Sequence, residues 1–535
     1  MRAVCSVAWL VVGVGWALGL EIRAETVPTA EPANDTRAVV ADWDVPRMAA
    51  QIDRRIESKL AAQGIVAGPL SDDAEFFRRV HLDLIGVLPQ PAEARAFLAD
   101  LRPDKRAEVI ERLLASPRHA THLANTWRQF LLPGVPGPEQ IANVAGLQNW
   151  LRQQFAENLR YDRIVGDLLV ATGGGSAGPA LYFTALDLVP EKLAASTARN
   201  FLGLRIECAQ CHQHPFDRWT QADFWGYAAF FARLRRSDAM PGLQRVELVD
   251  AESGEVFLPD TQTVVLPKFL DNMPLDPDAA ADTRRIQLAI WIASRDNPYL
   301  ARAAVNRVWA HLFGRGLVEP VDDLGPHHPP SHPELMDELT EWLIARQYNL
   351  RDLFRAIAGS QAYQRTSRVA ADHGSSLDHY GVMAIKTLTA EQLYDCLERL
   401  VRRPMQVSEP FAFGEAAQFD PRRLNFAARM RMQGNSARDF EAGVLQALTL
   451  LNGDDTANST NRQTSGLLIA LEAPWLTDDE RLDTLFLATL SRFPDPTERN
   501  AFHALRTSLA ATDQQEAWSD LLWALVNSAE FQLNH

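Results

Sequence analysis

Helix-forming patterns recur along most of this 535-residue chain, and they constrain its fold more than any other feature. Apolar residues repeat at the three- and four-residue spacing of a helical face, and several runs begin at a capping pattern. In a capping box, a Ser or Thr is followed three residues later by an acidic or amide side chain, and together they satisfy free backbone N–H groups. The pattern occurs at Thr220 with Asp223, Ser331 with Glu334, Thr389 with Gln392, and Thr477 with Glu480. The sequence therefore predicts a mainly α protein.

The predicted helices fall into two regions of the chain. In the first region we expect helices at about 92–101, 104–115, 119–132, 139–158 and 162–171. In the second we expect them at about 283–294, 298–313, 332–346, 350–359, 389–402, 440–451, 462–472, 478–491, 496–509 and 515–529. Lengths of about ten to twenty residues are ordinary for globular helices.

Residues 243–268 have a different character, which is typical of short strands. Val246 and Leu248 precede the turn residues 252–254, and Val256 and Leu258 follow them, so the pattern predicts a β-hairpin. Residues 261–266 predict a further strand. We therefore expect two helical domains with a small β-hairpin insert between them. Their expected bounds are 46–235 for the N-terminal domain, 236–282 for the insert and linker, and 283–535 for the C-terminal domain.

The N-terminus predicts export from the cytoplasm. Residues 1–24 combine Arg2, an apolar run from Ala3 to Leu20 and a small residue at Ala24, the pattern of a secretory signal peptide. A retained membrane anchor is the alternative, because the run borders on the length that spans a bilayer. Residues 25–45 are polar and predict a linker, and no later segment predicts a membrane span. The mature protein is thus expected to be periplasmic or extracellular.

The negative net charge of the chain argues against a nucleic-acid partner. The formal net charge is −15, whereas nucleic-acid-binding proteins usually carry a basic face, so we expect no nucleic-acid partner. The sequence contains no His-Glu-x-x-His or phosphate-loop motif. It therefore leaves open whether the protein is an enzyme.

Residues 208–212 read Cys-Ala-Gln-Cys-His, the attachment pattern of c-type haem. Two thiols three residues apart can reach the two vinyl positions on one edge of a porphyrin, and the adjacent His212 can present its imidazole to the iron. Covalent haem attachment normally takes place outside the cytoplasm, which agrees with the signal peptide. Cys208, Cys211 and His212 are therefore candidate haem c ligands.

Two alternatives to haem stay open for this segment. The two cysteines could form a tight disulfide in an oxidising compartment. Cys208, Cys211, His212 and His214 could instead bind zinc as two sulfurs and two nitrogens, although ligands so close in sequence strain a tetrahedral site. Other weak candidates for a metal or a second axial ligand are Met240, His311 and His332. The histidine-rich turn 327–332 is interpreted as a solvated loop before a helix.

The residues around the cysteines resemble the planctomycete cytochrome-associated domain family, also catalogued as domain of unknown function 1549. The resemblance is carried by residues 201–205 and 208–219, together with 52–54 and 78–89. Residues 297–318, 329–335 and 525–531 resemble its usual partner, domain of unknown function 1553. The resemblance implies a cytochrome-like exported protein and a sulfatase-like exported partner. Larger relatives carry an additional haem-attachment domain at the N-terminus, and we expect none in this chain.

The sequence thus supports two functions. The first is an exported cytochrome-like protein, a c-type haem module for electron transfer or redox chemistry. The second is a non-enzymatic binding or scaffold protein of an exported polysaccharide-processing system, in which the cysteines form a disulfide or bind zinc.

Export gives the first testable prediction. The mature chain should begin near Glu25, because the predicted cleavage site lies directly before it. N-terminal sequencing of protein from the native host measures this. Soluble cytoplasmic protein that keeps Met1 would contradict the prediction.

Overall fold

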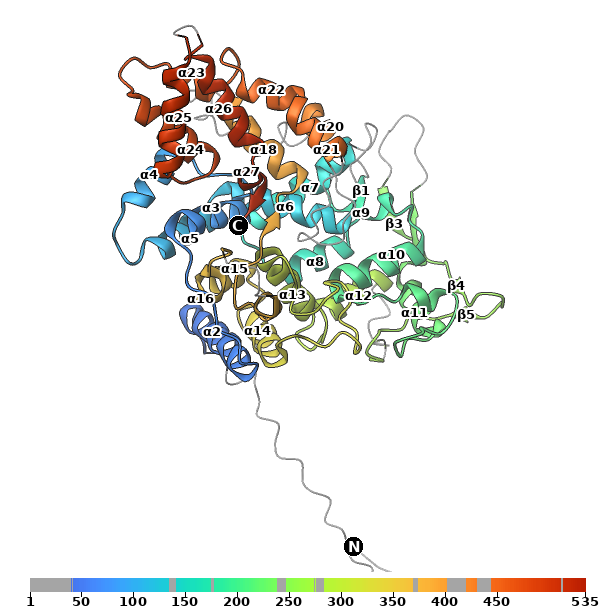
Figure 1. Ribbon diagram of the computed structural model, residues 1–535. Coiled ribbons are helices and arrows are strands. Elements are labelled where there is room, and N and C mark those ends of the chain that lie inside the picture. The colour runs from blue at the N-terminus through green and yellow to red at the C-terminus, as the bar shows by residue number, and fades with distance from the viewer. Residues whose placement is uncertain are drawn as a thin grey trace, which may run out of the picture.

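The computed structural model describes residues 40, 42–133, 141–174, 178–237, 247–273, 275, 283–368, 374–401, 420–430, 444–510 and 513–535. The described chain is mainly α, as the periodicity predicts (Figure 1). The predicted signal peptide and most of the predicted linker lie outside these residues. None of the described helices is both long and apolar enough to cross a membrane.

The helices of the first region follow one another closely along the chain. They are α2 (Val45–Ala62), α3 (Asp73–Ile85), α4 (Pro91–Ala99), α5 (Lys105–Leu114), α6 (Pro117–Leu131), α7 (Ile141–Ala156), α8 (Tyr161–Leu169), α9 (Ala180–Ala185), α10 (Pro190–Thr197) and α11 (Gln221–Ala228). The five predicted here agree with α4–α8 to within a few residues.

The second region is also helical throughout its described parts. Its helices are α12 (Arg284–Ala293), α13 (Leu300–Phe313), α14 (Pro333–Ala345), α15 (Leu350–Gly359), α16 (Gln361–Gln364), α17 (Gly374–Asp378), α18 (Ala390–Val401), α20 (Pro421–Met430), α21 (Val444–Asn452), α22 (Asp454–Thr460), α23 (Gly466–Leu471), α24 (Asp478–Thr489), α25 (Pro496–Ser508), α26 (Glu516–Val526) and α27 (Ala529–Gln532). The predictions did not include α16, α17, α20, α22 and α27.

The strands are short, and the predicted hairpin is wrong in its pairing. Strand β3 (Glu247–Asp250) lies between β1 (Gly173–Gly174) and β2 (Leu234–Arg236), antiparallel to both. Because both edges of β3 are occupied, β4 (Val256–Phe257) pairs with β5 (Val264–Val265) instead. This second hairpin projects at the right edge of Figure 1. Strand β1 comes from a distant part of the chain, and local sequence cannot reveal this partner.

The capping predictions hold at three of four helix starts. Thr220 and Thr477 form complete capping boxes, and the Thr389 hydroxyl accepts from the Gln392 backbone N–H. Ser331 does not cap α14, which begins one residue later than the motif predicts. The Ser331 backbone N–H instead donates to Leu317 O at 2.7 Å, which holds this serine in the preceding turn.

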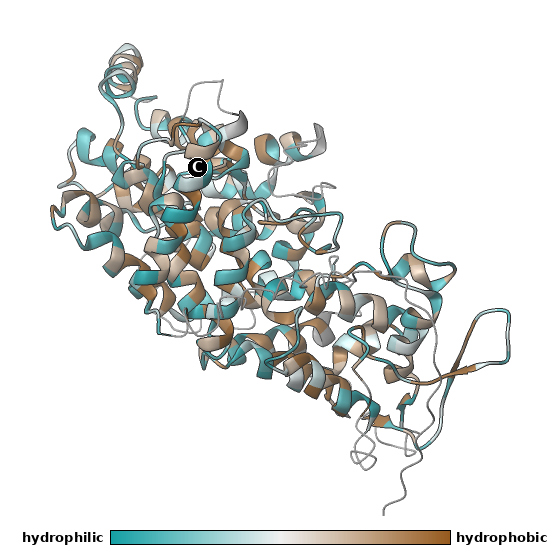
Figure 2. Cartoon of the chain, turned by 90° about the horizontal axis from the view of Figure 1, so that it is seen from below, coloured by the Kyte–Doolittle hydropathy of each residue, from teal (hydrophilic) through white to brown (hydrophobic). Residues whose placement is uncertain are grey.

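Elements of the two predicted domains pack directly on one another. Helix α2 lies against α14 and α15, and α4 lies against α24, as Figure 1 also shows. At the C-terminus, β7 (Leu533–Asn534) pairs with β6 (Lys386–Thr387) beside α3. Most helices carry both apolar and polar residues around their circumference (Figure 2). The buried apolar side chains form one continuous cluster that includes both regions.

The capping result yields a stability prediction. Thr477→Ala removes the hydroxyl that accepts from the Glu480 backbone N–H at the start of α24, so it should lower the free energy of unfolding by about 1 kcal/mol. Thr507→Ala is the matched control, because Thr507 is exposed inside α25, where alanine is at least as good a helix former. Urea unfolding measures both. Equal effects of the two changes would contradict the account of the cap.

Candidate functional site

The cysteine segment is a surface turn held by hydrogen bonds from α11. Cys208 lies in a 3-10 turn (Glu207–Gln210), and Cys208 and Cys211 are exposed and not joined to each other. The Trp225 indole N–H donates to Gln210 O at 3.0 Å, and the Gln221 amide donates to Cys211 O at 3.1 Å. Helix α11 therefore fixes the backbone of the turn while leaving both thiols accessible.

The two histidines after the cysteines have opposite hydrogen-bonding arrangements. Nδ1 of His212 faces Gln213 O at 2.7 Å, so this nitrogen donates and Nε2 keeps its lone pair. Nδ1 of His214 instead accepts from the Asp217 backbone N–H at 2.9 Å, so the proton of the neutral ring lies on Nε2. His212 therefore presents a nitrogen suited to ligate iron or zinc, whereas Nε2 of His214 does not.

The histidine-rich turn of the second region packs against this segment. The Leu324 backbone N–H donates to Gly203 O at 2.7 Å. Gly203 has a φ of +64°, and a Cβ there would lie 2.8 Å from the Leu324 side chain, so the approach requires glycine. Rings of His214 and His327 stack with centroids 6.4 Å apart. The interpretation of turn 327–332 as merely a solvated loop thus missed its contact with the cysteine segment.

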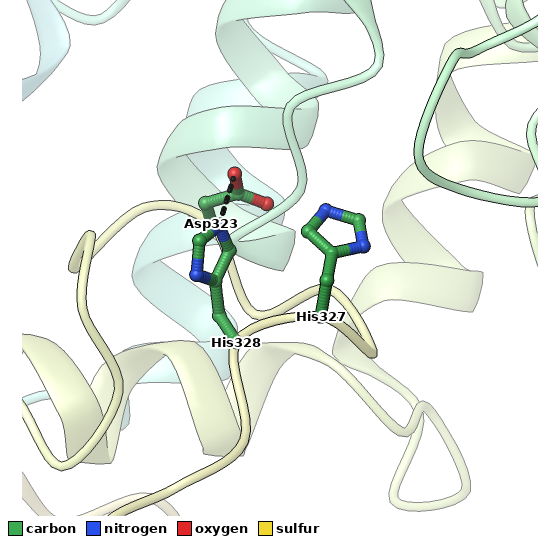
Figure 3. Close-up of side chains that lie close together, drawn as sticks. All are labelled: Asp323, His327 and His328. Carbon is green, nitrogen blue, oxygen red and sulfur yellow. Dashed lines mark ion pairs between the residues drawn. The ribbon is translucent and has the colours of Figure 1, made fainter.

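Asp323, four residues before this turn, forms a cluster with His327 and His328 (Figure 3). One ligand atom of each lies within 4.8 Å of the other two. Asp323 and His328 are half-buried, and His327 is exposed. The sequence offered the adjacent histidines, but Asp323 has no pattern that marks it.

The other predicted metal-site residues make their contacts elsewhere. His311 lies on α13, and its Nε2 donates to Asp83 O at 2.8 Å. His332 is buried beside Tyr380, with ring centroids 5.4 Å apart. Met240 lies outside the described residues.

A second candidate site is a cavity of about 340 Å³ between the two regions of the chain. Its wall includes the buried carboxylate of Asp83, whose Oδ1 lies 2.5 Å from Nζ of Lys386 and accepts from Asn534 at 2.7 Å. Oδ2 of Asp83 accepts from the Tyr363 hydroxyl at 2.8 Å. Nζ of Lys386 also donates to Leu312 O at 2.7 Å. These hydrogen bonds stabilise the ion pair of Asp83 with Lys386, which is nearly inaccessible to solvent.

Two helices present polar faces to this cavity. Side chains of α6 line it at helical spacing: Arg118, Thr121, His122, Asn125, Thr126 and Gln129. From α18 the acidic side chains of Glu391, Asp395 and Glu398 line it at the same kind of spacing. Helices normally bury apolar faces, so two polar faces on one cavity indicate a binding site for a polar molecule.

The cavity histidines are held neutral by their surroundings. Burial, and then the nearby His311, lowers the pKa of His122 well below its usual value. Burial also lowers the pKa of His311, although the Asp83 carboxylate opposes this shift. Nε2 of His122 is buried and has no hydrogen-bond partner among the described residues. A neutral imidazole of this kind can form a hydrogen bond with a bound molecule.

The protein is thus mainly α, and the Cys-x-x-Cys-His turn of its first region packs against the histidine-rich turn of its second region. Comparison with known families agrees with this two-part layout. Residues 51–236 match PSCyt2, a protein of unknown function (DUF1549), and residues 284–411 match PSD1, a protein of unknown function (DUF1553). The chain belongs to the proteins that carry these two domains in this order. No curated protein and no solved structure matches it significantly.

The buried ion pair gives the prediction for the cavity. Lys386→Met leaves the Asp83 carboxylate buried without its cation, so it should lower the free energy of unfolding by about 3–5 kcal/mol. Adding Asp83→Asn should cost less than the sum of the single changes, because the lone charge is then gone. Urea or thermal unfolding measures these values.

The exposed pair of Arg302 with Asp337, at 2.5 Å, provides the matched control. Arg302→Ala should change the free energy of unfolding by at most about 1 kcal/mol, because water screens this pair. A loss at Lys386 no larger than the loss at Arg302 would contradict the account of the network.

Proposed function

We propose that the protein is an exported cytochrome-like module that carries haem c on Cys208, Cys211 and His212 and serves electron transfer. One observation carries the proposal: the Gln213 carbonyl holds the proton of His212 on Nδ1 and leaves the lone pair on Nε2. Imidazoles that ligate metals commonly donate their other N–H to a backbone carbonyl in this way, which fixes both tautomer and ring orientation.

The cysteines suit covalent attachment for a separate reason. Both thiols are exposed, so a porphyrin and the proteins that attach it have access to them. Cys396 is the opposite case, because burial raises the pKa of its thiol to about 11 and removes it from solvent. The donor set present at residues 208–212 therefore fits haem c.

Bound haem c would supply a one-electron redox couple at the protein surface. The chain's own part is to hold it in place through Cys208 and Cys211. His212 would provide the proximal nitrogen. Helix α11 supports this arrangement through the hydrogen bonds of Trp225 and Gln221 to the turn. A surface position favours transfer to a second exported protein, and the family resemblance suggests a sulfatase-like partner or a redox partner.

A second candidate function is a non-enzymatic binding or scaffold protein, and the polar cavity between α6 and α18 favours it. In this function the cysteines are structural or bind zinc, and the cavity holds a polar ligand of an exported polysaccharide-processing system. Six carboxylates and four cationic side chains line the cavity, a balance that suits neutral polar groups better than strongly anionic ones.

Expression in a host with haem-maturation machinery tests the leading function. The purified chain should be coloured, and the colour should survive denaturation because thioether bonds are covalent. Its pyridine haemochrome should have the c-type position. Cys208→Ala and Cys211→Ala should each weaken or abolish attachment, and His212→Ala should change the spin state and potential. Absorption spectroscopy measures all of these effects.

Cys396→Ala is the control for thiol loss, and its spectrum should equal that of the unchanged chain. Colourless protein from a host that matures other c-type cytochromes would contradict the haem proposal. It would favour the binding or scaffold function. Alkylation of Cys208 and Cys211 before and after reduction would then distinguish a disulfide from free thiols.

A further inference from the structure

The second region holds three metal-ligating side chains close together, those of Asp323, His327 and His328. Figure 3 shows these side chains clustered at one turn, with the Asp323 carboxylate beside the His328 ring. None of them belongs to the cysteine motif, so a metal site formed by these side chains is separate from the proposed haem ligands.

The separation of Asp323 and His328 fits two ligands of one metal ion. Their closest atoms, Oδ2 and Nε2, lie 3.4 Å apart. That distance is long for a hydrogen bond between nitrogen and oxygen, which is usually about 2.7–3.2 Å. Two ligands at about 2.1 Å from a tetrahedral ion lie about 3.4 Å apart. The pair thus has the spacing of neighbouring metal ligands.

The backbone of this turn is fixed before any ion binds. The Asp323 N–H donates to Pro320 O at 3.0 Å, and the His328 N–H donates to Gly325 O at 3.0 Å. On the flank, the Arg205 guanidinium donates to Asp322 at 2.5 Å. Together with the bond from Leu324 to Gly203, these contacts hold the turn against the first region. A preorganised set of ligands binds a metal at less entropic cost.

The donor types select the class of ion. Two imidazole nitrogens and one carboxylate oxygen suit divalent first-row transition metals, whereas Mg²⁺ and Ca²⁺ prefer oxygen ligands alone. With His327 exposed, the remaining coordination positions face solvent, as in metal sites that keep a position for water or substrate.

We propose that Asp323, His327 and His328 bind one divalent first-row transition ion of the Zn²⁺ class, with an open coordination position. Asp217 of the cysteine segment reaches the same place. A Cβ on Gly325 would lie 3.2 Å from Nε2 of His327 and 3.3 Å from Oδ2 of Asp217. Gly325 therefore keeps open the space between these two side chains, and Asp217 is positioned to accept a hydrogen bond from a metal-bound water.

A titration with Co²⁺ tests the site, because this ion substitutes for Zn²⁺ and absorbs visible light when four-coordinate. The chain is used without an affinity tag and with Cys208→Ala and Cys211→Ala, so neither haem nor thiolate contributes to the spectrum. One equivalent of Co²⁺ should bind, and Zn²⁺ should displace it. His327→Ala, His328→Ala and Asp323→Asn should each weaken binding at least about tenfold.

His503→Ala is the matched control. Its imidazole contacts Asp479 at 3.0 Å, a surface His–Asp pair with ordinary hydrogen-bond spacing, so the change should leave Co²⁺ binding intact. Circular dichroism and urea unfolding confirm that each variant is folded. His327→Ala is the decisive variant, because this exposed side chain contributes little to the core.

Absence of stoichiometric Co²⁺ binding, or equal binding by the unchanged turn and all three variants, would overturn the proposal. Asp323 and His328 would then form an ordinary ion pair. This outcome is independent of the haem test, since the cysteines are already replaced. Loss of haem with retained Co²⁺ binding would contradict only the proposed function.

Discussion

The buried carboxylate of Asp83 is the contact on which the rest of the structure depends. It lies near the C-terminal end of α3 and accepts hydrogen bonds from Tyr363, Lys386 and Asn534, all nearly 300 residues or more away in the sequence. The backbone oxygen of the same residue accepts from His311. A buried carboxylate is tolerated only when it is paired and fully hydrogen-bonded. Burial of Asp83 in the folded protein therefore depends on partners from α13, β6 and the C-terminal strand.

This dependence explains how the two surface features of chemical interest come together. The core fixes α13 and the turn that follows it, and Gly203 allows Leu324 to approach the end of the first region. The cysteine turn and the histidine turn thus meet as a result of the packing beneath them. The cavity lies beside the same network, between α6 and α18. A change in the core would consequently be felt at both places.

Local sequence predicts most of the helices, because their apolar spacing and caps are local properties. Thr477 with Glu480 shows this well, since both members of the motif lie within one helical turn. Ser331 shows the limit, because its backbone is recruited by Leu317 and the helix starts later. Strand pairing fails for the same reason: Leu248 finds its partner at Gly173, 75 residues earlier in the chain.

Some residues of the candidate sites can likewise be found from local sequence, whereas others are brought together only by the fold. Cys208, Cys211 and His212 form a contiguous motif, so the sequence reveals them. His327 and His328 are visible as a histidine-rich turn, but their contact with the cysteine segment depends on long-range packing. Nothing in the sequence marks Asp83 and Lys386 as a pair, because each is an ordinary charged residue until the fold buries it. The polar face of α6 could have been found by testing polar residues for helical spacing.

The two segments that match known families fold as one unit, and this unit holds the cysteine turn against the histidine turn. Native-state hydrogen exchange tests this most directly. If Asp83 joins the segments, the slowest amides of α3 and α13 should exchange with one common free energy of opening. Asp83→Asn should lower that value equally in both helices. Different opening free energies for α3 and α13, or a loss confined to α3, would contradict the claim.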